Sequence, residues 1–528
     1  MWAGWNSSCR SRLISSETSS PGLTARLLRF PLILVLTGIA SIAMLGPALH
    51  AFVQDDHSVA RAFLYSSVLG VTFILLVGLA IAGRRQQDNS DIQNLASLAL
   101  AYTALPVFLA LPFYEGLETT RFLNAYVEMV SCLTTTGATL FDNPARLVDS
   151  LHLWRGMVGW FGGLLIWIAA SAVLAPMNLG GFEITVSAEP GQGEDALSRF
   201  RRASSARRIA QSTQALAPVY VGLTGVVWFL LVIGGDRPLV AAVHAMSTMA
   251  TSGISAVGGV ENAGSGFGGE IVIFLFMFFA LSRLTFSSDT LTSKSTSVLG
   301  DPEFRIGCAL VLGVPLVLFS RHWLGAFDVD QVEDLGQALQ ALWGGTFTVM
   351  SFLSTTGFQS AAWEAAQSWS GLGTPGLLLM GLAMFGGGVA TTAGGVKLLR
   401  IYALYLNGQR EMERLIHPSS VGRAGVHTRR MRREGAFVAW IFFMLFALSL
   451  ALVTVLMAAF GEDLQNAIVL STAALATAGP LTQVGADAPI ALLEMHPAAK
   501  LVFSAAMVLG RMETLALIAL FNPSLWRR

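Results

Sequence analysis

The chain has 528 residues, of which 53% are apolar and only 12% are charged, and its mean hydropathy is +0.61. This composition excludes an ordinary soluble globular domain and indicates a protein that lies in a lipid bilayer. The 33 basic and 33 acidic residues cancel, so the net charge gives no reason to expect nucleic acid as a partner.

The first part of the chain is rich in Ser and Arg and precedes a long apolar run that reaches Val53. This run is too long for the core of a secretory signal, so it predicts a retained membrane helix. Residues 1–27 are then a cytoplasmic N-terminal segment. The three cysteines (Cys9, Cys132, Cys308) are too scattered for a disulfide framework or a metal site, and we expect free thiols.

Ten apolar stretches are long enough to cross a bilayer, which takes about 20 residues each. They lie at 28–53, 60–83, 91–113, 155–178, 207–233, 270–292, 304–323, 373–405, 434–460 and 498–521. Four shorter apolar segments, at 121–136, 238–252, 340–356 and 463–478, cannot cross and are too hydrophobic for loops. They predict pore helices that enter the membrane without spanning it.

The spans group into an all-α membrane fold with two accessory N-terminal helices and four repeats of helix, pore helix and helix around one central pore. The boundaries are 28–85 for the accessory pair and 91–178, 199–292, 304–405 and 434–523 for the repeats. Most Lys and Arg fall on alternate connections, which predicts that both termini are cytoplasmic. Charged residues at 199–208 and 410–433 are then solvated inner loops or docking surfaces.

A similar turn follows each pore helix. The turns read Cys-Leu-Thr-Thr-Thr-Gly, Thr-Met-Ala-Thr-Ser-Gly, Phe-Leu-Ser-Thr-Thr-Gly and Ala-Leu-Ala-Thr-Ala-Gly, and they end at Gly137, Gly253, Gly357 and Gly479. One copy alone is equally compatible with a flexible turn, but four copies after four short helices favour a pore.

Irregular backbone at membrane depth is tolerated only where it is buried in protein or lines water. An ion that leaves water needs oxygens in place of its hydration shell, and extended backbone supplies one carbonyl per residue. Glycine permits positive φ, so that consecutive carbonyls can face one axis. The four turns contain no carboxylate, which favours selection of a monovalent cation by carbonyls over a calcium-like ring of Glu.

These motifs resemble the TrkH/KtrB superfamily of K⁺ transporters over nearly the whole chain. The likeness is carried by Trp154-Arg155, Trp160–Gly163, Glu189–Gly191, His244–Gly253, Phe385–Lys397, His417-Pro418, Gly510–Glu513 and Phe521–Pro523. The resemblance implies K⁺ uptake, without enzymatic activity or a bound cofactor, across a bacterial cytoplasmic membrane. It further implies homodimers and a cytosolic nucleotide-binding regulatory subunit of the TrkA/KtrA type.

The resemblance assigns the ion-binding filter to three residues in each repeat. These are Thr135, Thr136 and Gly137, then Thr251, Ser252 and Gly253, then Thr355, Thr356 and Gly357, and finally Thr477, Ala478 and Gly479. Repeat four departs from the family, which usually has Asn where this chain has Thr477 and a second Gly where it has Leu481.

Residues 386–395 hold five glycines within the predicted span 373–405, so this helix is expected to break. Close helix packing through small residues is the alternative. In the resembling family this segment obstructs the pore below the filter. The gate residues are then Gly386, Gly387, Gly388, Thr391, Thr392, Gly394, Gly395 and Arg511.

Arg511 is expected to need a polar partner, because a central membrane Arg costs about 2.5–3.5 kcal/mol. We expect it to bond to carbonyls of the 386–395 loop and to repel cations, or else to be a structural Arg paired elsewhere. Glu513 is too close in sequence to face it on one helix. Arg283 and Asp289 are expected to form a structural pair, and Lys397 lacks the context of a nucleotide-binding loop.

A secondary transporter that couples K⁺ to Na⁺ or H⁺ is the main alternative function. Its inverted repeats need an odd number of spans in each half, whereas each unit here has two spans and returns to the same side. A regulatory relative that keeps the pore fold without conduction is a further alternative.

Overall fold

The computed structural model describes residues 30–81, 91–177, 179–181, 205–282, 301–324, 335–417 and 433–513, together with 516 and 520. Every regular element in these parts is helical, in agreement with the predicted all-α fold class. Seven of the described helices are long and apolar enough to cross a membrane. They are Leu32–Val53, His57–Ile81, Ile92–Gly116, Asp149–Leu174, Ser205–Ile233, Pro302–Arg321 and Gly435–Ala459.

The other three predicted spans have shorter helices in the described residues. At 270–292 the chain forms α11 (Gly266–Met277) and a 3-10 turn to Ala280. At 373–405 it forms α15 (Pro375–Met384) and α16 (Leu398–Ile416), which are separated by irregular chain. At 498–521 it forms α20 (Pro497–Met512), so Arg511 lies in the last turn of a helix and not at its centre.

Some sequence predictions fall outside the described residues. These are the N-terminal segment 1–27, Cys9, Glu189–Gly191, Arg283, Asp289, Pro418 and Phe521–Pro523.

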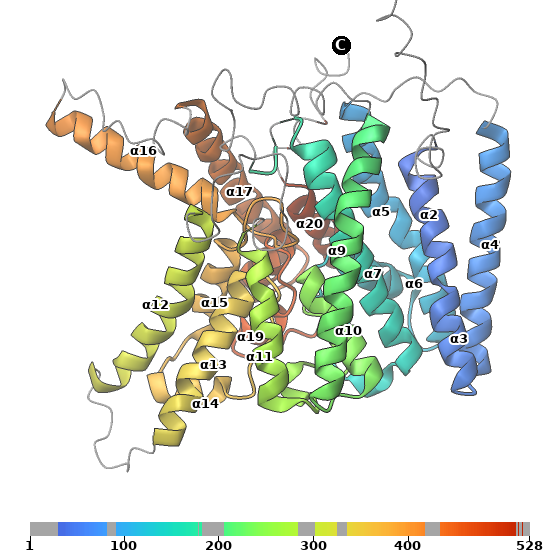
Figure 1. Ribbon diagram of the computed structural model, residues 1–528, viewed down its shortest axis with the longest axis horizontal. Coiled ribbons are helices and arrows are strands. Elements are labelled where there is room, and N and C mark those ends of the chain that lie inside the picture. The colour runs from blue at the N-terminus through green and yellow to red at the C-terminus, as the bar shows by residue number, and fades with distance from the viewer. Residues whose placement is uncertain are drawn as a thin grey trace, which may run out of the picture.

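The N-terminal helices form a separate layer beside the first repeat. Helix α2 (Leu32–Ala43) continues as α3 (Leu45–Val53), and a short turn leads into α4 (His57–Ile81). Helices α2 and α4 pack on α5 (Asp91–Gly116), and α3 packs on α7 (Asp149–Ala169). Figure 1 shows α2, α3 and α4 at one end of the molecule.

One helix precedes each of the four glycine turns; three of these helices have 12 or 13 residues, and the helix of repeat three, with 19, is longer than the short segment 340–356 that the sequence predicts. They are α6 (Phe122–Leu133), α10 (Pro238–Ala250), α13 (Leu335–Leu353) and α18 (Leu464–Leu475). The first helices of repeats two, three and four are α9 (Ser205–Ile233), α12 (Pro302–Leu324) and α17 (Arg433–Ala459), and α14 (Trp363–Ser370) and α19 (Leu481–Val484) follow the third and fourth turns.

The repeats close into a ring. The second helix of each repeat packs on the pore helix of the next, as α7 on α10, α11 on α13 and α15 on α18. Helix α20 then packs on α6, which joins the fourth repeat to the first. A buried hydrogen bond from Lys500 Nζ to Asn124 Oδ1, 2.8 Å long, stabilises the contact between α20 and α6. The order around the centre is therefore one, two, three, four, and repeat four lies opposite repeat two.

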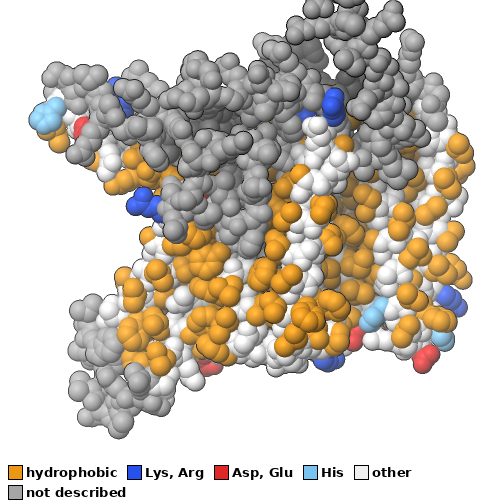
Figure 2. Space-filling view, viewed as in Figure 1, with side chains coloured by type: hydrophobic (Ala, Val, Ile, Leu, Met, Phe, Trp, Pro, Cys, Tyr) orange, Lys and Arg blue, Asp and Glu red, His pale blue; other side chains and the backbone are white. Residues whose placement is uncertain are grey.

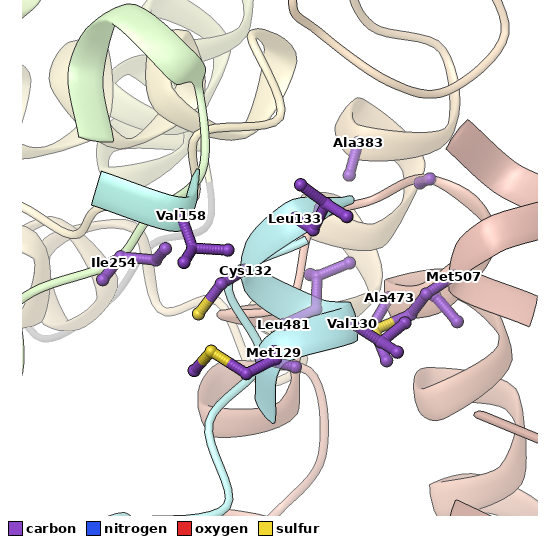
Figure 3. Packing of buried hydrophobic residues seen from close by; sticks show 14 of the residues in the cluster. Met129, Val130, Cys132, Leu133, Val158, Ile254, Ala383, Ala473, Leu481 and Met507 are labelled. Carbon is purple, nitrogen blue, oxygen red and sulfur yellow. The ribbon is translucent and has the colours of Figure 1, made fainter. Parts of the chain in front are cut away.

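Glycines let the second helices approach the pore helices at backbone distance. A Cβ on Gly162 would lie 2.1 Å from the Leu133 carbonyl oxygen, and one on Gly510 would lie 2.4 Å from that of Leu475. Hydrophobic side chains fill the remaining space, and Figure 3 shows those of α6 between Val158 on one side and Met507 on the other. The turn after each pore helix is thus held in a dense core.

The outer surface is apolar over a broad band. Exposed hydrophobic side chains include Leu75, Leu79, Phe229, Leu452 and Val455. Figure 2 shows hydrophobic side chains across the middle of the visible face, while most of the charged and His side chains lie near its upper and lower edges. Such an exposed band matches the hydrocarbon layer of a bilayer.

Candidate ion pathway

Four threonines occupy equivalent positions at the ends of the pore helices, and each adopts a left-handed backbone conformation. The φ angles are +53°, +50°, +59° and +50° at Thr135, Thr251, Thr355 and Thr477. This conformation costs an L-residue about 1–2 kcal/mol and suits a β-branched residue poorly. Because strain that recurs at equivalent positions must be maintained by its surroundings, these turns are candidates for function. The sequence predicted positive φ only for the glycines.

The residue after each of these threonines donates its backbone N–H to the pore helix of its own repeat. This N–H donates to the carbonyl five residues earlier, at 2.9–3.0 Å, in Thr136, Ser252, Thr356 and Ala478. In a trans peptide the N–H and the C=O point in opposite directions. The carbonyl of each left-handed threonine therefore points away from the pore helix, toward the centre that the four turns share.

The glycines of the first three repeats lie against their neighbours. Gly137, Gly253 and Gly357 have φ of +74°, +67° and +84°. A Cβ on Gly137 would lie 1.6 Å from the carbonyl oxygen of Ser252, and one on Gly253 would lie 2.3 Å from that of Thr356. The turns therefore enclose a narrow passage lined by backbone, in which no side chain fits at these positions.

The fourth turn differs from the other three after Thr477. The φ angle of Gly479 is not positive, and its N–H donates to the carbonyl of Thr136 at 2.7 Å. The short helix α19 begins two residues later, and it has no counterpart at the same place after the other turns. Repeat four thus leaves the common geometry between Thr477 and Leu481, the two positions at which the sequence departs from the resembling family.

The irregular segment between α15 and α16 lies against the inner ends of three turns. Gly394 N donates to Thr355 Oγ1 at 2.8 Å, and Thr251 Oγ1 donates to Thr392 Oγ1 at 3.2 Å. A Cβ on Gly394 would lie 2.0 Å from Thr477 Oγ1. The loop therefore occupies the space directly below the passage.

Backbone bonds to neighbouring elements hold this loop in place. Gly387 N donates to the carbonyl of Leu353 at 3.0 Å, and Gly388 N donates to that of Ala280 at 2.9 Å. The carboxylate of Glu303 accepts from Val389 N at 2.9 Å. Glycines at this place can approach other backbone closely, which explains why the sequence breaks the helix with them.

Two buried cations lie at the loop. Arg511 donates from one guanidinium nitrogen to the carbonyl of Thr392 at 2.7 Å, which is the contact expected from the sequence. Lys397 Nζ donates to the carbonyl of Ala393 at 2.5 Å. Both side chains line a cavity of about 30 Å³ beside the loop. Positive charge below the passage opposes the entry of another cation.

Glu513 pairs with Arg400 at 2.7 Å, not with Arg511. The Arg400 side chain is fully buried, and its guanidinium lies 3.6 Å from the centre of the Phe442 ring, where a cation–π attraction adds to the ion pair. Glu513 itself has φ of +62°. This pair joins the start of α16 to the residue that follows α20, and sequence analysis missed it.

Buried carboxylates brace the chain that follows two of the turns. Glu128 of α6 pairs with Arg155 at 2.7 Å and accepts from Leu140 N at 2.9 Å. Glu270 of α11 accepts from Ala361 N and Ser360 Oγ, each at 2.7 Å. Their only sequence signal is an acidic residue within an apolar helix, which indicates a buried partner without identifying it.

A hollow of about 420 Å³ lies beside repeat four and carries acidic side chains, among them Glu462, Asp487 and Glu494. Burial, and then the nearby charge of Asp463, raise the pKa of Glu462. Among the described residues, no group of three or more His, Cys, Asp or Glu is arranged to hold a metal ion. Cys132 and Cys308 are free thiols.

Comparison with known proteins identifies the family. Residues 271–528 match the TrkH family, described as a cation transport protein. The Trk system potassium uptake protein TrkH of Salmonella typhimurium is 30% identical over 508 residues, covering 93% of this chain and 98% of that protein. The chain belongs to the TrkH family. The Escherichia coli K12 TrkH protein, with the same coverage, is 29% identical over 504 residues.

A solved structure shares the fold of this TrkH-family chain. The crystal structure of the potassium transporter TrkH from Vibrio parahaemolyticus matches it with a TM-score of 0.77 at 24% identity, over 96% of this chain and 100% of that one. Within this fold the structure brings the twelve expected filter residues together at one centre. It places the expected gate loop directly below them, with Arg511 in contact.

Proposed function

We propose that this chain admits K⁺ through a filter lined by backbone carbonyls. The filter consists of Thr135, Thr136, Gly137, Thr251, Ser252, Gly253, Thr355, Thr356, Gly357, Thr477, Ala478 and Gly479. The observation that carries the proposal is the set of four left-handed threonines, whose carbonyls point away from their pore helices toward one centre. Such carbonyls replace the hydration shell of a monovalent cation. The related proteins are named as potassium uptake proteins, which supports K⁺ as the ion.

The hydroxyls at the inner end of the filter support an ion site there. Thr135 Oγ1 and Thr477 Oγ1 are both buried, and neither has a hydrogen-bond partner among the described residues. A buried hydroxyl without a partner costs about 1–3 kcal/mol, and a cation between the turns would remove part of that cost. The inward-negative membrane potential contributes about 2.3 kcal/mol per charge per 100 mV, so uptake needs no coupling to Na⁺ or H⁺.

The loop between α15 and α16 is the proposed gate, and its contacts with Thr355 and Thr251 support a closed position. Gly386, Gly387, Gly388, Thr391, Thr392, Gly394 and Gly395 form this barrier, and Arg511 fastens it. Ion passage requires the loop to leave the inner ends of the turns. The Arg511 charge, held at the carbonyl of Thr392, then has to move away from the path as well.

The surroundings of the pore are part of the proposal. Both termini lie in the cytoplasm of a bacterium, as the distribution of Lys and Arg supports. Two copies pair as a homodimer, and a cytosolic nucleotide-binding subunit of the TrkA/KtrA type moves the gate. Helix α16 projects from the bundle in Figure 1 and exposes Tyr405, Met412, Leu415 and Ile416, which gives such partners an apolar surface.

Flux of K⁺ and of Na⁺ into proteoliposomes that contain the purified protein tests the filter. Gly357→Ser should reduce K⁺ selectivity, because its φ is +84° and a Cβ would lie 2.7 Å from the Pro480 ring. Gly373→Ser is the control, since no atom lies within 4 Å of a Cβ there. If folded Gly357→Ser protein had the same ratio of K⁺ to Na⁺ flux as folded Gly373→Ser protein, the filter assignment would be contradicted.

Arg511→Gln tests the gate in the same vesicles. Loss of the buried charge and of its bond to Thr392 should raise basal K⁺ flux without a regulatory partner. Arg414→Gln is the control, because Arg414 is a partly exposed residue paired with Glu411 on α16. Unchanged flux in folded Arg511→Gln protein would remove Arg511 from the gate and leave the filter assignment intact.

A further inference from the structure

Pro480 lies across the centre of the four turns. A Cβ on Gly357, in the neighbouring repeat three, would lie 2.7 Å from Pro480 Cγ. A Cβ on Gly253 would lie 2.6 Å from the same atom, and Gly253 belongs to repeat two. Repeat two is opposite repeat four in the ring, so a side chain that reaches both glycines extends over the axis and not only along the wall.

In repeat four, two backbone carbonyls beside Pro480 are also turned away from the centre by hydrogen bonds to the chain that follows. The carbonyl of Ala478 accepts from Leu481 N at 3.1 Å. The carbonyl of Gly479 accepts from Thr482 N and from Thr482 Oγ1, both at 2.9 Å. These oxygens are satisfied by the start of α19. The residues directly after the first three glycines have no regular secondary structure, so no such helix starts at the same place.

A further bond fixes repeat four against repeat one. Gly479 N donates to the carbonyl of Thr136 at 2.7 Å, which brings Pro480 inward. The backbone angles of Pro480, φ −57° and ψ −14°, are ordinary for the first turn of a helix. The ring is therefore held in position by hydrogen bonds and by an unstrained helix start, not by local strain.

We infer that Pro480 is the outer constriction of the ion path and helps to set ion selectivity and maximal flux. This inference rests on the proposed function. Three repeats line the outer end of the filter with backbone, and the fourth closes it with a proline ring that an entering ion must pass. Selectivity at this level then comes from one apolar ring beside the backbone of three repeats, in contrast to a set of carbonyls from all four repeats.

The experiment compares Pro480→Ala with the wild type in the proteoliposome assay, with K⁺ and Na⁺ measured separately. Alanine can adopt the same φ and ψ. The substitution removes the ring atoms Cγ and Cδ and adds one backbone N–H, which proline lacks. We expect several-fold higher total flux and a several-fold higher ratio of Na⁺ to K⁺ flux. Pro489→Ala is the matched control, because Pro489 lies in an exposed part of the same outer segment. It should leave both quantities unchanged.

Two further variants allow the same test if the Pro480→Ala protein does not fold. Pro480→Gly removes the whole ring, and Thr482→Val removes one of the bonds that hold the Gly479 carbonyl while leaving the proline in place. Each should shift the Na⁺ to K⁺ ratio upward in protein that elutes as one species and melts like the wild type. Wild-type values in all folded variants, with K⁺ flux present, would overturn the constriction alone. K⁺ flux absent from the wild type and from Arg511→Gln would instead overturn the proposed function on which it rests.

Discussion

The buried pair behind the first turn makes a quantitative prediction. Glu128 is fully buried on α6, and its partner Arg155 on α7 is 3% exposed. Glu128→Gln removes the carboxylate charge but keeps an oxygen that can accept from Leu140 N. The remaining cost is then that of a buried guanidinium without its counter-ion, about 3–5 kcal/mol.

A double-mutant cycle separates the pair from its packing. Arg155→Met should destabilise the protein by a similar amount, because it leaves the Glu128 charge without its partner. The double variant removes both charges, so it should cost less than the sum, with a coupling of about 0.5–3 kcal/mol. Unfolding of the purified protein in detergent by heat or denaturant measures each value.

The surface pair of Glu411 and Arg414 on α16, 3.0 Å apart with side chains 54% and 34% exposed, is the control for this cycle. Exposed pairs are worth about 0–1 kcal/mol, so Glu411→Gln should change the unfolding transition little. Simple additivity of Glu128→Gln and Arg155→Met would refute the reasoning, because it would show that the two charges do not depend on each other.

Three other predictions concern the gate and the third turn. Glu513→Gln should weaken the bond to Arg400, loosen the attachment of α16 beside the loop and raise basal K⁺ flux, whereas a wild-type leak rate would show that the pair is only structural. Glu270→Gln should destabilise the protein by about 1.5–3 kcal/mol through weaker bonds to the chain after the third turn, and should reduce K⁺ over Na⁺ selectivity in the flux assay. Gly394→Ala should push the loop away from Thr477 and increase leak, while Gly408→Ala, which has open space around its Cβ, should leave flux unchanged.

Residues whose role depends on a repeated local pattern could be predicted from the sequence. The turns around Gly137 and Gly357 have similar sequences, and each follows a similar apolar helix. This repeated pattern predicts that the turns lie at one centre, without any knowledge of long-range contacts. The break before Gly394 follows from glycine content alone. The contact of Arg511 was predictable in kind, because a buried Arg must find oxygen acceptors and the nearby irregular loop supplies them.

Contacts between distant segments could not be predicted in this way. Glu513 and Arg400 are separated by more than a hundred residues, and a single sequence does not show which acidic residue meets which base. Glu128 and Glu270 gave only the general signal of a buried charge. The position of Pro480 depends on α19, a helix of four residues, and such a short element has no periodicity to detect.

The packing of α20 on α6 has a consequence for biosynthesis. Helix α6 is made early, and its partner in the ring, including Lys500, is made almost at the end of translation. A ribosome-bound chain with three repeats in the membrane therefore has an open groove where the enclosed passage will later be. Under the proposed function, the passage is enclosed only after the last repeat has been inserted, so an unfinished chain should not conduct ions by this route.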